Sequence, residues 1–229
     1  MLNYLKTYIK ARPRFYDFIN HWRPISGDLP RWLDSFSRRN LGPVKFIQVG
    51  ANDGLRWDPL RRFILRDDWE GVFVEPIPPV YDLLRKNYAY LKRQKLYFEN
   101  TAISNQSGEI EFWSYSRNFL RTLDIEKQLY YLRKSSLSRE VVKKSLADFS
   151  DIEDKIHCYK VPSTQVARII DKYFQVDLVF IDAEGFDDDL HSAHLEGSSG
   201  GFRDCVSAVS RLCYAIRSGW LSPLRAPLG

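Results

Sequence analysis

Three short apolar runs in the sequence each end in residues that can bind a ligand or move a proton. The runs at 44–49 (VKFIQV), 71–74 (GVFV) and 176–181 (VDLVFI) are followed by Gly50, Ala51, Asn52, Asp53 and Gly54, by Glu75, and by Asp182 and Glu184. Glycines let a ligand approach the backbone, and a helix that begins there offers N–H groups to an anion. A carboxylate 21 residues beyond Gly54 can accept hydrogen bonds from both hydroxyls of a ribose.

The glycine spacing excludes two common phosphate-binding motifs. VGANDG has glycines four residues apart, which is not the GxGxxG of a dinucleotide fold, and the chain lacks the GxxxxGK[ST] of a P-loop. A structural turn between a strand and a helix uses similar residues, and an isolated Glu75 would be read as a solvated strand end. The spacing between the turn and Glu75 favours ribose binding.

Asp182 and Glu184 are the candidates for a catalytic base. Two neighbouring carboxyls raise the pKa of one of them, which suits a group that takes up a proton. The alternative is that Asp182 caps the loop and orients backbone amides. The acids at 187–189, with His191 and His194, are of the types that hold a divalent ion. Acids at the start of a helix are also favoured by its dipole, and we predict no metal ligand.

The elements that position these residues alternate along the chain. Strands are predicted at 44–49, 71–75, 96–103, 109–115, 156–161 and 176–181, and helices at 59–66, 79–91, 125–147 and 164–173. Uniformly apolar strands alternating with helices indicate an α/β fold with a mostly parallel sheet covered on both faces. Ligands of such sheets bind at the carboxyl ends of the strands.

Five blocks of the sequence carry a family resemblance. The blocks are FIQVGANDG, GVFVEPIPPVYDLLRKNY, FENTAIS with SGEIEFW, VPSTQVARII and VDLVFIDAEGFD. In this order they resemble the blocks of FkbM-type methyltransferases, which use S-adenosylmethionine. The resemblance covers 44–190. It implies a Rossmann-like class I methyltransferase sheet and O-methylation of a hydroxyl on a small molecule, sugar or glycan.

The resemblance also implies roles for individual residues. The turn against the methionine and ribose of the cofactor would be formed by Gly50, Ala51, Asn52, Asp53 and Gly54, and Glu75 would hold the ribose hydroxyls. Near the adenine would lie Pro76 and Ile77, and its rim would be lined by Asn100, Thr101 and Ala102. Asp182 and Glu184 would face the methyl group and the acceptor. Gln48 stands where many members have Asp, so Asp53 is the substitute for a contact to the cofactor's amino group. An insertion at 116–155 would form a lid that selects the acceptor; the alternative is a solvated helical face.

The charge distribution argues against nucleic acid as a partner. The 229 residues carry a net charge of +5, made of +5 in 1–40, −2 in 41–190 and +2 in 191–229, so the body that holds the site has no basic surplus for tracking phosphates. Cys158, Cys205 and Cys213 cannot all pair and form no metal motif. With no signal peptide and no apolar run of about 20 residues, we expect a cytoplasmic protein.

The two ends of the chain differ from the methyltransferase domain predicted at 41–190. Residues 1–40 predict a helical extension that packs beside this domain; the alternative is a peripheral contact with an anionic membrane. Residues 191–229 contain no Lys and two of the three Cys, and we predict an atypical tail with one helix at 202–216 and without the last strands of the sheet. One hypothesis is a reading frame lost near His191. The alternative function is an impaired remnant or nucleotide-binding module that acts through a protein or membrane partner.

Overall fold

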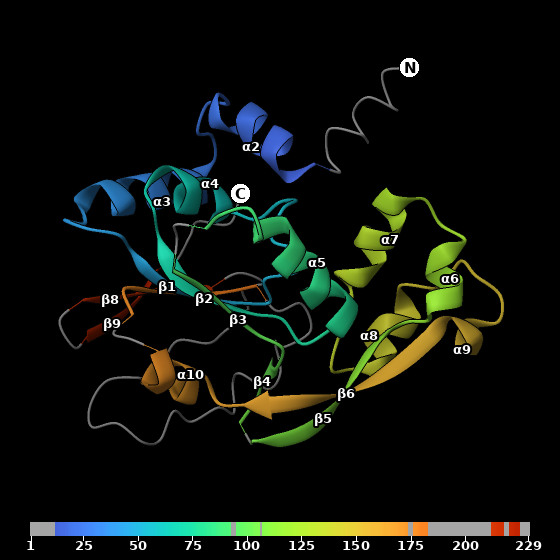
Figure 1. Cartoon of the computed structure of the whole chain (residues 1–229). Coiled ribbons are helices and arrows are strands. Elements are labelled where there is room, and N and C mark those ends of the chain that lie inside the picture. The colour runs from blue at the N-terminus through green and yellow to red at the C-terminus, as the bar shows by residue number, and fades with distance from the viewer. Residues whose placement is uncertain are drawn as a thin grey trace.

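The computed structural model describes residues 12–92, 95–105, 107–173, 176–182, 212–217 and 220–224. Its main sheet has the strand order β3-β2-β1-β7-β8-β9 (Figure 1). The strands are β1 (Lys45–Val49), β2 (Glu70–Val74), β3 (Leu96–Glu99), β7 (Leu178–Ile181), β8 (Leu212–Arg217) and β9 (Trp220–Leu224). The four strands from β3 to β7 are parallel, and β8 and β9 are antiparallel to their neighbours. The mostly parallel α/β sheet is therefore confirmed.

Helices cover both faces of this sheet because alternate strand residues point to opposite sides. On one face Phe46 and Phe73 pack against α3 (Asp28–Arg39), α4 (Arg61–Arg66) and α5 (Pro78–Tyr88). On the other face Ile47 and Val72 pack against α10 (Val166–Tyr173). Burial on both sides explains why these strands are apolar throughout.

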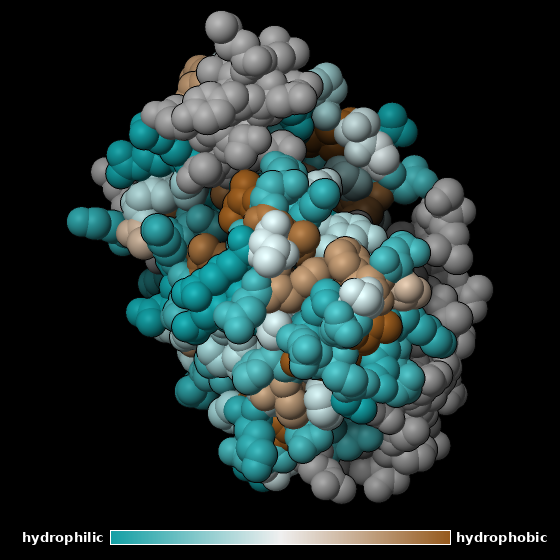
Figure 2. Space-filling model, turned by 90° about the vertical axis from the view of Figure 1, so that its right-hand side faces the viewer, coloured by the Kyte–Doolittle hydropathy of each residue, from teal (hydrophilic) through white to brown (hydrophobic). Residues whose placement is uncertain are grey.

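A second, smaller sheet carries a helical cap. Its order is β4-β6-β5, with β4 (Ala102–Ile103), β5 (Gly108–Tyr115) and β6 (Ile156–Thr164). The segment between β5 and β6, residues 116–155, is here called the cap; it contains α6 (Arg117–Arg121), α7 (Ile125–Leu132), α8 (Arg139–Lys144) and α9 (Ile152–Lys155). The cap shares a small apolar core with the second sheet, around Phe119 of the cap and Tyr115 of β5. The face that carries the cap is mostly hydrophilic, with small hydrophobic areas (Figure 2).

Two predicted elements are each divided in the structure. The strand expected at 96–103 separates into β3 and β4, which belong to different sheets. The chain turns away at Asn100, whose amide donates to the carbonyls of Glu75 and Pro76 at 2.8 and 3.0 Å. The helical stretch expected at 125–147 separates into α7 and α8, because Ser136 pairs with Trp113 of β5 through two backbone hydrogen bonds.

The tail prediction is wrong for residues 212–224. In place of the end of a helix at 202–216, β8 continues the main sheet beside β7, and β9 pairs with β8. Two apolar runs separated by Ser218 and Gly219 are typical of a β-hairpin, a signal that the sequence prediction did not include. Pro223 lies in β9, at the edge of the sheet, where its missing N–H is tolerated.

The first described helix, α2 (Pro13–His21), turns a charged side chain inward and aromatic side chains outward. Asp17 forms an ion pair with Arg61 of α4, with Nε–Oδ1 at 2.6 Å. Phe18 and Trp22 are 63% and 73% exposed. Within the described ranges, no helix has both the length and the apolar character that crossing a membrane requires.

Candidate active site

The carboxyl ends of β1, β2 and β7 meet at a cavity that the second sheet and the cap close from the other side. Most of the wall is apolar. The cavity is lined by Val49, Gly50, Asn52, Val74, Glu75, Pro76, Ile77, Val80, Thr101, Ala102, Ile103, Phe112, Leu132, Arg133, Ser135, Leu137, Ile181 and Asp182. Eight of the predicted site residues are therefore brought together: Gly50, Asn52, Glu75, Pro76, Ile77, Thr101, Ala102 and Asp182.

The turn after β1 is fastened to the end of β2 by backbone hydrogen bonds. The amides of Gly50 and Ala51 both donate to the carbonyl of Val74, at 3.0 and 3.1 Å. Gly50 and Asn52 have φ angles of 73° and 52°, in the left-handed region that glycine and asparagine tolerate best. This conformation turns the amide of Asn52 toward Glu75.

Glu75 lies in the cavity wall with both carboxylate oxygens anchored. Oε2 accepts from the amide of Asn52 at 2.9 Å, and Oε1 accepts from the amide of Ile77 at 3.0 Å. A carboxylate has about four acceptor positions, so each oxygen keeps one for a ligand. Burial raises the pKa of Glu75 to about 7, although the two amides favour its ionised form. The site therefore offers a fixed acceptor pair to a vicinal diol.

The residues after β3 support the cavity from its rim. Thr101 and Ala102 line it, and the Thr101 hydroxyl donates to the carbonyl of Pro162 at 2.9 Å. Asn100 lies behind the wall, where its amide holds the segment after β2 in place.

Asp182 follows β7 and lines the cavity opposite Glu75's strand, with its amide donating to the carbonyl of Val49 at 2.9 Å. Glu184 lies outside the described residues, as do the acids at 187–189, His191 and His194. In the part of the chain that the structure describes, no three side chains of metal-binding type lie together.

Besides Asn100, three predicted cofactor residues do not line the cavity: Ala51, Asp53 and Gly54. Asp53 Oδ1 accepts from the amides of Leu55 and Arg56, and Oδ2 pairs with the Arg56 guanidinium at 3.2 Å. Asp53 thus caps the turn, and its contact with the cofactor's amino group stays a prediction. A Cβ on Gly54 would lie 2.4 Å from Leu84 and 2.6 Å from Tyr88, so glycine is required for α5 to pack here.

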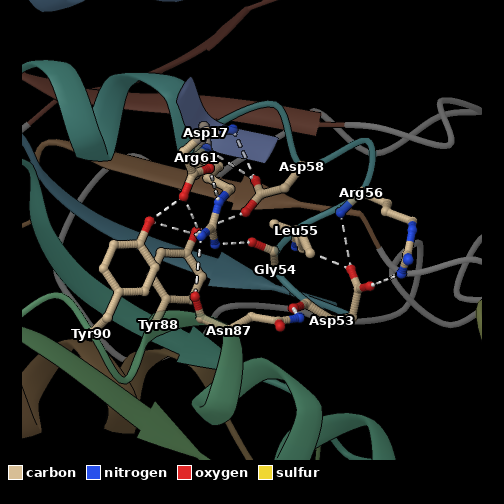
Figure 3. A network of polar contacts seen from close by, with 11 residues as sticks. Asp17, Asp53, Gly54, Leu55, Arg56, Asp58, Arg61, Asn87, Tyr88 and Tyr90 are labelled. Carbon is tan, nitrogen blue, oxygen red and sulfur yellow. Dashed lines mark hydrogen bonds and ion pairs between the residues drawn. The ribbon is translucent and has the colours of Figure 1, made fainter. Parts of the chain in front are cut away.

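A buried polar network, shown in Figure 3, fixes the backbone of the turn after β1. Arg61 donates to Asp17, to the carbonyl of Gly54 at 2.6 Å and to the carbonyl of Asn87 at 3.1 Å. Asn87 in turn donates to the carbonyl of Asp53 at 2.8 Å. The backbone of the turn is therefore fixed by helices α2, α4 and α5.

A second part of the network contains the hydrogen bond of the Gln48 side chain. Its amide donates to Asp58 Oδ1 at 3.2 Å, and the Tyr88 hydroxyl donates to Asp58 Oδ2 at 3.0 Å. Burial raises the pKa of Asp58. Gln48 points to the helices beneath the turn rather than into the cavity.

The sequence prediction did not include the cavity residues contributed by β5 and the cap, namely Phe112, Leu132, Arg133, Ser135 and Leu137. The spacing of these residues in the sequence does not indicate a binding site, because they reach the cavity only through the pairing of β5 with β6 and the packing of the cap. Leu132, Arg133, Ser135 and Leu137 belong to the cap, and the lid function predicted for 116–155 stays a prediction.

Comparison with known families agrees with this geometry. The family model described as "Methyltransferase FkbM domain" matches residues 48–205, which is more than half of the chain. The match extends past Leu190, into the segment predicted to be an atypical tail. No curated protein and no solved structure matches the chain. The match to the family model, together with the parallel sheet and the cavity at the ends of β1, β2 and β7, shows that the chain belongs to the FkbM methyltransferase family.

Proposed function

We propose that this methyltransferase is S-adenosylmethionine-dependent and methylates the oxygen of a hydroxyl on a small molecule, sugar or glycan. The observation that carries the proposal is Glu75: a buried carboxylate, fixed by two backbone amides, in the wall of a cavity at the strand ends. A ribose diol is the ligand that such an acceptor pair fits.

The cavity has surfaces that suit the rest of the cofactor. Ile77 and Val80 form an apolar wall with Phe112 and Leu132, against which an adenine ring would pack. Gly50 and Asn52 also line the cavity, where they would contact the methionine part. When bound, the cofactor supplies an activated methyl group on a sulfonium.

Asp182 is the proposed proton acceptor. As the new oxygen–carbon bond forms and the carbon–sulfur bond breaks, the acceptor hydroxyl must lose its proton, and a carboxylate in the cavity wall can take it. Glu75 would hold the cofactor at its ribose, and a fixed cofactor position would help to align the methyl group with the acceptor oxygen. The cap reduces access of water to the cavity.

We also propose a cytoplasmic location. Cys158 is a free thiol among the described residues, in line with a reducing compartment.

Calorimetric titration with S-adenosylhomocysteine, followed by transfer of a radiolabelled methyl group to a panel of hydroxylated acceptors, tests the proposal. We expect Glu75→Ala to abolish binding. Asp182→Asn should keep S-adenosylhomocysteine affinity while lowering turnover by about 10²- to 10⁴-fold. Glu111→Gln, on an exposed position of β5 outside the cavity, is the matched control and should change neither value. No binding by the wild type would refute the proposal, and binding without transfer to any acceptor would favour the impaired remnant.

A further inference from the structure

Arg133 is a cation of the cavity wall that has no anionic partner in the described part of the chain. It follows α7 directly, lines the cavity and is partly buried. Its Nε is buried without a hydrogen-bond partner, and no ion pair joins Arg133 to a carboxylate within the described ranges. Arg133 shares an unpartnered Nε with Arg56, Arg62 and Arg139, but of these four arginines it alone lines the cavity, where an anionic ligand would supply the missing partner.

The guanidinium is held in place by an aromatic ring. Its Cζ lies 4.1 Å from the centroid of the Trp57 ring. Trp57 itself has a φ of 57°, a conformation that a bulky residue adopts at a cost of about 1–3 kcal/mol. The indole is 54% exposed, so the ring covers one face of the guanidinium from the solvent side, and stacking on a ring face uses none of the guanidinium N–H donors.

The chemistry of the group defines the ligand. A guanidinium presents N–H donors in a planar fork that matches the two oxygens of a carboxylate. Trp57 belongs to the segment that follows the glycine turn, so Arg133 links the cap to the turn side of the cavity. The Glu75 carboxylate accepts from the amides of Asn52 and Ile77, and within the described ranges neither Glu75 nor Asp182 forms an ion pair with Arg133.

We propose that Arg133 is the carboxylate-binding residue of the cavity. The proposal rests on the proposed methyltransferase function and deepens it. Two sources supply such a carboxylate in that reaction: the amino-acid end of the cofactor, or an acidic acceptor such as a hydroxy acid or a uronic acid. The two sources are separated by ligands that differ in the carboxylate.

The experiment compares Arg133→Gln with the wild type by calorimetry, using S-adenosylhomocysteine and 5′-methylthioadenosine, which lacks the amino-acid end. The matched control is Arg139→Gln. Arg139 is also in the cap, lies over Trp113 at 5.2 Å and has a buried Nε without a partner, but it pairs with Glu153 and does not line the cavity. Thermal unfolding of both variants reports whether the cap stays folded.

If the cofactor supplies the carboxylate, Arg133→Gln weakens S-adenosylhomocysteine binding about ten- to hundredfold and leaves 5′-methylthioadenosine binding unchanged. If the acceptor supplies it, both affinities are unchanged, and methyl transfer to glucuronate or 4-hydroxybenzoate falls relative to glucose or 4-hydroxybenzyl alcohol. Either result supports the proposal when Arg139→Gln behaves as the wild type.

The proposal is overturned if Arg133→Gln changes neither cofactor affinity nor acceptor preference, or if it weakens the two nucleosides equally. In both cases the wild type still binds S-adenosylhomocysteine, so the proposed function survives. A wild type that binds neither nucleoside refutes the proposed function itself.

Discussion

The pH dependence of nucleoside binding provides a direct test of Glu75. Its side chain is 5% exposed, and burial raises its pKa from the ordinary 4.5 to about 7, with a smaller contribution from the charge of Asp53. At about 1.4 kcal/mol for each pH unit, this rise means that the protein disfavours the ionised carboxyl by about 3 kcal/mol. The amides of Asn52 and Ile77 are not sufficient to offset burial.

A ribose diol donates hydrogen bonds and so requires the ionised carboxylate. With a pKa of about 7, Glu75 is about nine-tenths ionised at pH 8 and about one-tenth ionised at pH 6. Binding should therefore weaken as the pH falls, with a Kd for 5′-methylthioadenosine about tenfold higher at pH 6 than at pH 8. At pH 6 binding should also be accompanied by release of nearly one proton.

Calorimetry between pH 5.5 and 8.5 measures both quantities, the proton release from buffers that differ in ionisation enthalpy. Glu75→Gln should bind more weakly and with the same Kd at every pH. Asp182→Asn should keep the tenfold change, because Glu75 is intact. The reasoning is refuted if the wild-type Kd varies by less than about twofold across this range and Glu75→Gln binds as tightly as the wild type.

Three further predictions concern stability and the surface. Gly54→Ala combines a strained φ of 60° with overlap onto α5 and should lower the free energy of unfolding in urea by about 2–5 kcal/mol. Gly42→Ala, with open space around it, should change it by less than about 0.5 kcal/mol; equal values would contradict the packing argument. Arg61→Met removes the cation from Asp17, whose carboxylate is 12% exposed and keeps a hydrogen bond from the Tyr90 hydroxyl, so urea unfolding should show a loss of about 3–5 kcal/mol, and a loss below about 1 kcal/mol would argue against a tight network. Finally, we propose that the aromatic face of α2 contacts anionic membranes: the wild type should sediment with phosphatidylserine vesicles but not with phosphatidylcholine vesicles, and Phe18→Ser with Trp22→Ser should abolish this. Equal sedimentation of wild type and double variant would exclude α2 as the contact.

Local pattern was sufficient for the strands of the parallel sheet and for the turn. Residues 44–49 and 71–75 are apolar at every position because both faces are buried, and this is visible without knowing which helix covers which face. Gly50 and Glu75 could be placed at strand ends for the same reason. Since parallel strands end at one edge of a sheet, their meeting in one cavity with Asp182 also followed.

Contacts between distant segments were not accessible in this way. The break of the predicted strand at Asn100 depends on carbonyls about 25 residues away in the chain. The pair of Arg61 and Asp17 joins residues 44 apart, and the hairpin at 212–224 is added to the sheet by pairing with β7. Each is decided by burial and pairing that no local periodicity encodes.

The sequence by itself determined the parallel strands β1, β2 and β7, the glycine turn, the acid that follows β2 and the family. Only the tertiary structure decided that Gly54 is a packing residue, that Asp53 caps the turn, and that Arg133 reaches the cavity from the cap. The physical reason is that apolar periodicity and turn chemistry act between neighbours in the chain. A side chain's role in a cavity instead depends on which segments are packed around it, and this is fixed by the pairing of β5 with β6 and the helices on either face of the main sheet.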